Sequence, residues 1–260
     1  MNRDDFWCMR RGKQLAVLSS EDEHLLSPIN LRNGKRHKAL LLLHGFSSSP
    51  AVYRLLLKHL KHYDALVAPV LPGHAENLAA FANMKAADLF SYVENTCSQL
   101  INEFERVDVL GLSMGGLLAC HLGMRFKLNH LYLLAPALDL HLNLEQSIKL
   151  AQGLQWLGFR QFRSAAGNLY TSSACEIAYR QLPLPAIIEI LTIIKHFKLG
   201  PLSCPVDLFL GVHDAVVDSQ KVAQQFANQP DVTLHWLENS AHVLPLDGDL
   251  DLIINTMTKE

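Results

Sequence analysis

The sequence predicts an α/β fold built around a mostly parallel sheet, and two observations support this prediction. Short apolar runs recur along the 260 residues, with helix-compatible segments between them, an alternation that is typical of βαβ units. The runs are continuously apolar instead of alternating with polar residues, as expected for strands that are covered on both faces. The predicted strands are residues 39–46, 64–71, 106–113, 130–136, 205–214 and 232–239.

Helical spacing of apolar residues marks most of the connections between these strands. We expect helices over residues 49–63, 86–104 and 113–126, and a further helix that begins after Asp218. Hydrophobic residues make up 49% of the chain, which is enough to fill a sizeable core. The length suits one large α/β domain, so we expect residues 1–260 to form a single domain.

One segment interrupts this rhythm, between the fourth and fifth predicted strands. Residues 137–203 are mostly helical in character, and a connection this long is usually a functional insertion such as a lid, or a separate subdomain. Within it, residues 182–201 carry a wide face of isoleucine and leucine. This face either packs on the body of the protein or lines a pocket for an acyl chain, and the two interpretations are compatible.

Charge and cysteine content exclude several classes of protein. The net charge of −2 draws the molecule as a whole to neither nucleic acid nor anionic lipid. Five scattered cysteines, none in a Cys-x-x-Cys pair, favour reduced thiols over a disulfide framework. The charged first residues do not resemble a secretory signal, and no run approaches the ~18 apolar residues of a membrane span. We therefore expect a soluble protein of the cytoplasm.

A glycine-lined turn holds the first candidate catalytic residue, Ser113. It lies in Gly-Leu-Ser-Met-Gly, between the apolar run that ends near Leu112 and a helix-compatible segment. This strand–turn–helix context is what a nucleophile elbow requires, since glycines let the strand turn sharply and leave the serine hydroxyl exposed above the sheet. The alternative is a plain turn in which the serine caps the helix.

A serine hydroxyl needs a base to attack a carbonyl at neutral pH, and the base needs a carboxylate to orient it. Asp214 and His242 follow Ser113 in the expected order, each just past the end of a predicted strand. Asp218 also follows the fifth strand, but it directly precedes a predicted helix and is better placed as an N-cap. The amides of Phe46 and Met114 are the candidate donors of an oxyanion hole.

The remaining histidines and cysteines do not suggest a metal or cofactor. No Cys/His group has zinc-ligand spacing, and no glycine-rich loop matches a phosphate or dinucleotide site. We expect His44 and His74 to brace loops, and His59 and His62 to be solvated. The prediction is an enzyme without metal and without cofactor.

Five segments together resemble the α/β-hydrolase superfamily: LLLLHGFSSSP, APVLPGHAENLAAF, VLGLSMGGLLA, GVHDAVVD and NSAHVLPLD. The resemblance covers residues 38–136 and 205–258, and it is nearest to small-cap carboxylesterases and bacterial monoacylglycerol-lipase-like members. It implies an eight-stranded, mostly parallel sheet with a short helical cap at 137–203, and serine hydrolase chemistry on carboxylic esters. By position, Ser113 corresponds to the nucleophile, Asp214 to the acid and His242 to the base.

Two positions depart from the family pattern. Alanine replaces glycine at Ala75 and at Ala241, beside the expected base, where a positive φ would strain the backbone.

The leading hypothesis is an esterase that takes an apolar acyl chain, with substrate contacts from the cap. A thioesterase with the same triad, or a non-catalytic binding protein that kept the fold, are the alternatives. The partner is then a small-molecule ester, with weak contact to lipid surfaces permitted.

Overall fold

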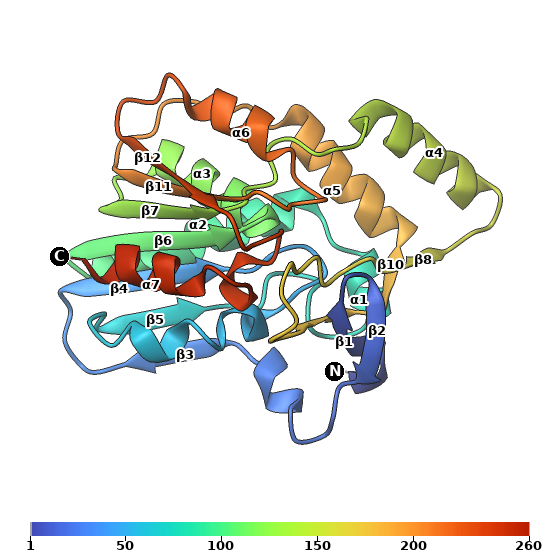
Figure 1. Cartoon of the computed structure of the whole chain (residues 1–260), viewed down its shortest axis with the longest axis horizontal. Helices are drawn as coiled ribbons and strands as arrows, with labels where there is room; N and C mark the ends of the chain where they lie inside the picture. Colours follow the sequence, from blue (N-terminus) through green and yellow to red (C-terminus); the bar gives the residue numbers. More distant parts are fainter. Residues whose placement is uncertain (1, 260) are drawn as a thin grey trace.

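The six predicted apolar runs all form strands, and they lie side by side in one central sheet. The computed structural model describes residues 2–259, and Figure 1 shows this sheet with helices on both of its faces. Neighbouring strands run parallel except at one edge, where β3 runs antiparallel to β5. In spatial order the strands are β12 (Val232–Leu237), β11 (Val206–Gly211), β7 (His130–Leu134), β6 (Arg106–Leu112), β4 (Lys38–Leu43), β5 (Ala65–Ala68) and β3 (Ile29–Arg32).

The described sheet has seven strands, so the eight strands implied by the resemblance are wrong by one. The chain before β3 does not add to the sheet edge. It forms a hairpin of β1 (Phe6–Arg10) and β2 (Lys13–Val17), and β1 pairs with β9 (Glu176–Tyr179) of the 137–203 segment. The hairpin of β1 and β2 is therefore tied to the 137–203 segment and not to the central sheet.

Three predicted helices form where their apolar spacing places them, and one does not. Residues 49–63 form two 3-10 turns, η3 (Pro50–Tyr53) and η4 (Leu57–His59), so the helix predicted there is wrong. All of η3 is buried, unlike a surface helix that buries one stripe, and the Tyr53 hydroxyl donates to the Leu43 carbonyl (2.7 Å). The other elements of the main body are α1 (Leu78–Ala82), α2 (Ala86–Glu103), α3 (Met114–Arg125), α6 (Ser219–Phe226), α7 (Leu250–Thr258) and the 3-10 turns η1 (Arg3–Asp5), η2 (Glu23–Leu26) and η5 (Leu244–Leu246).

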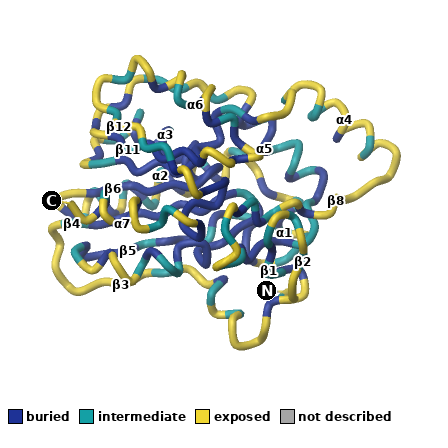
Figure 2. Tube along the Cα trace, in the orientation of Figure 1, coloured by how far each residue is buried: buried dark blue, intermediate teal, exposed yellow. Residues whose placement is uncertain are grey.

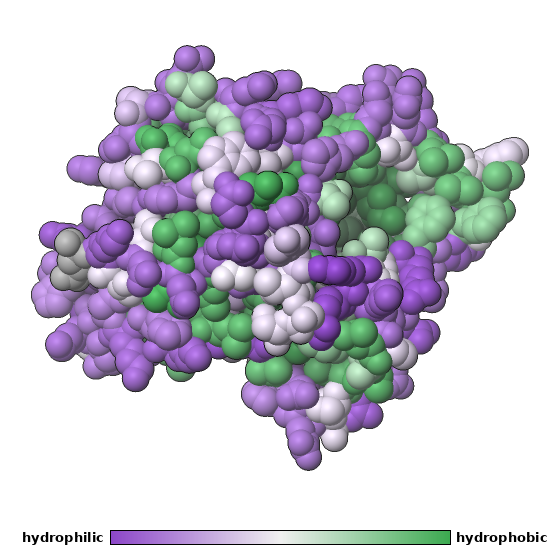
Figure 3. Space-filling view, in the orientation of Figure 1, coloured by the Kyte–Doolittle hydropathy of each residue, from purple (hydrophilic) through white to green (hydrophobic). Residues whose placement is uncertain are grey.

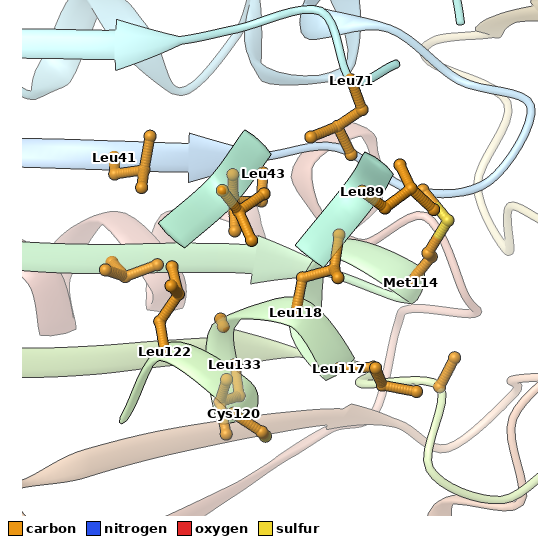
Figure 4. Close-up of a cluster of buried hydrophobic side chains, with 14 of the residues drawn as sticks. Leu41, Leu43, Leu71, Leu89, Met114, Leu117, Leu118, Cys120, Leu122 and Leu133 are labelled. Carbon is orange, nitrogen blue, oxygen red and sulfur yellow. The ribbon is translucent and has the colours of Figure 1, made fainter. Parts of the chain in front are cut away.

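Both faces of the sheet are buried, which explains why its strands are continuously apolar. In β4, Leu41 and Leu43 belong to a core shared with α2 and α3, whereas Leu40 and Leu42 belong to a second core shared with α7. Figure 4 shows side chains of β4 and of α3 gathered between the helix and the sheet. Figure 2 shows the same arrangement over the molecule, with buried strands and an exposed periphery. The sheet is therefore a rigid platform for the loops at its carboxyl edge.

The 137–203 segment lies between β7 and β11, and it is less helical than predicted. Its two helices, α4 (Leu144–Trp156) and α5 (Leu184–His196), flank three short strands. Of these strands, β8 (Gln161–Arg163) pairs with β10 (Gln181–Pro183), while β9 pairs with the N-terminal hairpin. The sequence did not show these pairings because the strands are three or four residues long, too short for a periodic pattern.

Helix α5 packs on the body of the protein, as one of its two interpretations predicts. Its buried isoleucines and leucines join the core that contains α2 and α3. The Glu189 carboxylate also accepts a hydrogen bond from the Ala86 amide (2.7 Å) and so caps the start of α2. Among the described residues, none of α5 lines the cavity beside Ser113. The role of α5 is to anchor the insertion.

The prediction that all cysteines are reduced is wrong for two of them. Cys8 in β1 and Cys175 just before β9 form a disulfide, with their Cα atoms 5.5 Å apart. The pairing of β1 with β9 brings these residues together across 167 residues of sequence, which cysteine spacing alone does not reveal. Cys97, Cys120 and Cys204 are free and buried. The cytoplasmic location stays a prediction.

No helix among residues 2–259 combines the length and the apolar character needed to cross a bilayer.

Candidate active site

Ser113 lies at a sharp turn between β6 and α3, in a backbone conformation that few non-glycine residues adopt. Its φ is 55° and its ψ is −116°, and such conformations cost about 1–3 kcal/mol and concentrate at functional sites. The flanking glycines make the turn possible. A Cβ on Gly111 would overlap the carbonyl of Gly115, and a Cβ on Gly115 would overlap the carbonyl of Leu43 in the next strand.

Backbone hydrogen bonds hold this turn on both sides. The Ser113 amide donates to the carbonyl of Leu134 at the end of β7 (2.9 Å), and the Ser113 carbonyl accepts from the amides of Leu117 (3.1 Å) and Ala137 (2.9 Å). The turn is thus fixed to the neighbouring strand and to the start of the 137–203 segment. These contacts hold the strained conformation of Ser113 in place, and such strain persists only where the surrounding structure fixes it.

Asp214 and His242 are directly hydrogen-bonded. His242 Nδ1 donates to Asp214 Oδ2 (2.7 Å), and both residues are buried. The second carboxylate oxygen of Asp214 accepts from the amides of Val216 (2.7 Å) and Val217 (2.9 Å), which fixes the rotation of the carboxylate. Asp218 instead accepts from the Lys221 amide (3.2 Å) and caps α6, as the sequence predicts.

Ser113 and His242 line one cavity, so the structure brings together the residues that the sequence singled out. Because Nδ1 of His242 faces Asp214, its Nε2 is the nitrogen available to a partner in the cavity. The cavity encloses about 170 Å³. Its lining residues are Gly45, Phe46, Ser47, Leu112, Ser113, Ser164, Ala165, Ala166, Gly167, Asn168, Glu176, Leu182, Val216, His242 and Val243.

The two candidate oxyanion donors come from two different elements: Met114 directly follows Ser113, and Phe46 lines the same cavity as Ser113. Met114 opens α3, so its amide is one of the first-turn N–H groups that have no acceptor within the helix. Phe46 lines the cavity just after β4, and its ring packs against Phe81 (centroids 4.9 Å apart). The side chain of Phe46 therefore packs, as expected, and leaves the amide as the group of interest.

Two buried histidines brace the loops beside this cavity. The Leu71 amide donates to Nε2 of His44 (3.0 Å), so the proton of this imidazole is on Nδ1, which donates to the Gly45 carbonyl (2.9 Å). Burial, with a contribution from His74, lowers the pKa of His44 to about 3. Burial likewise lowers the pKa of His74 to about 4. Both are neutral near pH 7, which suits loop bracing better than acid–base work.

The backbone strain expected at Ala241 is absent. A positive φ occurs instead at Ala75, the other position that departs from the family pattern. Among residues 2–259, the non-glycine residues with positive φ include Ala75 (52°) but not Ala241. The concern about the geometry beside His242 is therefore wrong. The Ala241 amide donates to Asp247 (2.9 Å), a contact that helps to fix the loop of His242.

Asn168, which sequence reasoning missed, joins the loops of the candidate acid and base. Its carbonyl accepts from the amides of His242 and Val243 (both 3.1 Å), and its side-chain oxygen accepts from the amide of Ala215, next to Asp214 (3.0 Å). A single asparagine in a loop of the insertion carries no pattern that could have identified it. Its role exists only because the insertion folds back over the sheet edge.

Glu176 is the second residue that the sequence did not reveal. It is buried in β9, lines the cavity, and accepts from the Gly167 amide (2.6 Å). Burial raises the pKa of its carboxyl group, against the opposing effects of the Gly167 amide, His242, Ser48 and the Arg54 guanidinium. Glu176 and His242 line the same cavity, close enough for the carboxyl group and the imidazole to influence each other's pKa.

The two carboxylates outweigh burial at His242. Burial by itself lowers the pKa of this imidazole, but the charge of Asp214, the hydrogen bond to Asp214 and the charge of Glu176 together raise it above its ordinary value. A raised pKa means that the imidazolium is stabilised in place. This arrangement can accept a proton from a neighbouring hydroxyl and hold it.

Comparison with known proteins places this chain in a family. Residues 40–253 match the model of the alpha/beta hydrolase family, which is more than half of the chain. The chain belongs to the alpha/beta hydrolase family. At low identity, this hydrolase is similar to a lipase and to an esterase.

Two curated relatives are similar over nearly their whole lengths. The hydrolase is 26% identical over 251 residues to the thermostable monoacylglycerol lipase of Bacillus sp. (strain H-257), covering 94% of this chain and 95% of the relative. It is 23% identical over 232 residues to a carboxylesterase of Bacillus subtilis (strain 168), covering 87% and 92%.

Solved structures of other hydrolases share the fold. A metagenome-derived lipolytic enzyme superposes with a TM-score of 0.77 at 24% identity, covering 89% of this chain and 95% of its own. The monoglyceride lipase of Saccharomyces cerevisiae has a TM-score of 0.68 at 16% identity, covering 88% of each chain.

Within residues 2–259 the hydrolase has no group of three or more histidines, cysteines or acidic residues arranged to hold a metal ion.

Proposed function

We propose that this hydrolase cleaves carboxylic esters through an acyl-enzyme formed on Ser113. The observation that carries the proposal is the hydrogen bond between His242 Nδ1 and Asp214 Oδ2 (2.7 Å) at the edge of the cavity that Ser113 lines. It leaves Nε2 of His242 facing the cavity, in the tautomer that can accept a proton from the serine hydroxyl.

The reaction then proceeds in two halves. His242 accepts the proton of Ser113 as the serine oxygen attacks the ester carbonyl, and the amides of Phe46 and Met114 donate to the developing oxyanion. The carbon–oxygen bond to the alcohol breaks, and His242 gives its proton to the leaving alcohol. A water molecule, deprotonated by His242, attacks the acyl-enzyme, and the proton returns to Ser113 as the acid leaves.

The cavity favours a substrate with an apolar acyl group next to a polar reacting centre. Leu112, Leu182, Val216 and Val243 supply apolar walls. The volume of about 170 Å³ is below the ~300–1,000 Å³ of typical ligand pockets, so a long chain must extend past the enclosed part. We propose that residues 137–203 act as the cap of the site, because Ser164 to Asn168 and Glu176 form one wall.

Two assays test this proposal. Turnover of p-nitrophenyl esters from acetate to palmitate should be measured for the wild type, Ser113→Ala and, as a matched control, Ser91→Ala on the exposed side of α2. We expect hydrolysis by the wild type and the control, and loss of turnover by several orders of magnitude in Ser113→Ala. Equal rates in the wild type and Ser113→Ala would overturn the proposal.

A fluorophosphonate probe separates the enzyme from a binding protein that kept the fold. Stoichiometric labelling at Ser113, located by mass spectrometry, is expected, and no labelling would favour the binding protein. Thioesters use the same triad, and nothing in the described cavity favours them. Comparison of an acyl-CoA with the matched glycerol ester decides between ester and thioester.

A further inference from the structure

Large apolar side chains are exposed together at the outer end of the 137–203 segment. Residues 155–163 are all exposed, and they follow directly from the last turn of α4. We call the large apolar side chains of this region, together with Leu150 in α4, the tip surface: Leu150 (64% exposed), Trp156 (86%), Leu157 (65%), Phe159 (54%) and Phe162 (42%).

The tip surface is clustered and not scattered over the molecule. Figure 1 places α4 and β8 at one end of the protein, away from the central sheet, and Figure 3 shows hydrophobic side chains gathered there beside a hollow with hydrophobic walls. Exposed apolar residues are ordinary when single, but contiguous patches mark interaction surfaces. A tryptophan with 86% of its surface exposed has no packing role in the chain itself.

The segment that carries the tip surface has charged residues of one sign only. Residues 146–175 contain no aspartate or glutamate, although the net charge of the whole chain is −2. Arg160 and Arg163 are exposed within the tip region, and neither forms an ion pair with any residue that the structure describes. Lys149, on the same helix as Leu150, pairs with Glu145 (2.8 Å).

We propose that the tip surface docks on the surface of an anionic lipid bilayer. Tryptophan, phenylalanine and leucine enter the boundary between head groups and acyl chains, and flanking arginines are attracted to anionic head groups. The segment of residues 146–175 has no acidic residue to oppose that attraction. In a symmetric dimer the tip surface would face its own copy, and the arginines of the two copies would meet without acidic partners from this segment.

The tip surface also adjoins the candidate active site. Phe162 in β8 lies opposite Leu182 in β10, and Leu182 lines the cavity beside Ser113. The chain then continues from Arg163 into Ser164, another residue of the cavity wall. Docking therefore places the lipid boundary next to the wall of the cavity. Lipid binding rests on the tip surface alone, and only delivery of an ester from the bilayer rests on the proposed function.

Co-sedimentation with vesicles tests the docking. Ser113→Ala serves as the parent, so that binding is measured without turnover, and vesicles of phosphatidylcholine with 30% phosphatidylglycerol are compared with phosphatidylcholine alone. We expect binding to the anionic vesicles. Trp156→Ser/Phe159→Ser should weaken it at least tenfold, and Arg160→Gln/Arg163→Gln about 25-fold, from roughly fivefold for each arginine near an anionic surface.

The control is Leu31→Ser, which removes an apolar side chain of similar exposure (56%) from the edge strand β3. It should bind vesicles as the parent does. Because the substituted side chains are exposed, thermal unfolding midpoints of all variants should agree, which separates a binding defect from a folding defect.

Three results would overturn the docking proposal: absence of binding to anionic vesicles, equal binding by the parent and the Trp156/Phe159 variant, or a dimer that dissociates in that variant without vesicle binding. The last result would identify a second copy of the chain as the occupant. Vesicle binding without hydrolysis of any ester by the wild type would overturn the proposed function and leave the docking intact.

Discussion

Replacing Asp214 by asparagine changes one oxygen for an amino group at the contact with His242. The Asp214 oxygen that accepts from the Val216 and Val217 amides remains available as the amide oxygen of the asparagine. The loop should therefore keep its shape. The other oxygen, Oδ2, becomes an NH2 group that faces Nδ1 of His242 and can only donate. In the wild type Nδ1 is itself the donor of this hydrogen bond. The imidazole must then place its proton on Nε2, and the group that faces the cavity can no longer accept one.

The expected loss of turnover in Asp214→Asn follows from this change of the His242 tautomer. In Ser-His-Asp hydrolases the equivalent change lowers turnover by roughly 10⁴, which corresponds to about 5.4 kcal/mol of transition-state free energy. The substitution also removes one of the two charges that raise the pKa of His242. We expect Asp214→Asn to lower kcat by about 10⁴, with a much smaller change in the free energy of unfolding.

Asp218→Asn is the matched control, four residues further along the chain. Asp218 accepts from the Lys221 amide at the start of α6, and asparagine caps helices about as well as aspartate. Turnover should stay within a few-fold of the wild type. Steady-state rates on a short p-nitrophenyl ester, with thermal unfolding of all three proteins, check both predictions. A large loss in Asp218→Asn with little loss in Asp214→Asn would show that the wrong carboxylate has been assigned to His242.

Three further predictions follow from the same contacts. Only neutral His242 accepts a proton and its pKa is raised, so kcat/KM should increase with pH through a midpoint above about 6.5. Glu176→Gln removes one of the charges that raise this pKa, so the midpoint of the variant should lie at a lower pH. An unmoved midpoint would refute the coupling between Glu176 and His242. Cys8→Ala removes the disulfide that links residues 167 positions apart. It should lower the free energy of unfolding, measured with denaturant, by about 2–4 kcal/mol. A reductant should destabilise the wild type by a similar amount and leave the stability of the variant unchanged. Gly115→Ala places a Cβ against the backbone of β4 and should destabilise the protein by about 3 kcal/mol or more. Gly153→Ala in α4, where a Cβ meets nothing within 4 Å, should instead stabilise the protein by about 0.5–1 kcal/mol. Equal effects of the two substitutions would refute the steric argument.

Local patterns in the sequence were sufficient for six of the seven strands of the central sheet, though not for the edge strand β3, and for singling out the three residues proposed as a triad. A strand covered on both faces must be apolar at consecutive positions, so β4, β6 and β7 were visible as runs. The turn at Ser113 required glycines within the turn itself, and these are next to each other in the chain. Asp214 was separable from Asp218 because a helix start marks one of them as a cap. Each of these features is decided by residues within about ten positions of one another.

Contacts between distant segments decided the rest, and no local pattern encodes them. Residues 49–53 are buried on every side by other parts of the chain, so their helical spacing did not produce a helix. The pairing of β1 with β9 brings Cys8 to Cys175 and sets Glu176 in the cavity wall. Such pairings depend on the net free energy of many weak contacts made at once. The sequence of a short strand does not predict these contacts. The sequence therefore determined which groups could react, and the tertiary structure decided which charges and which wall surround them.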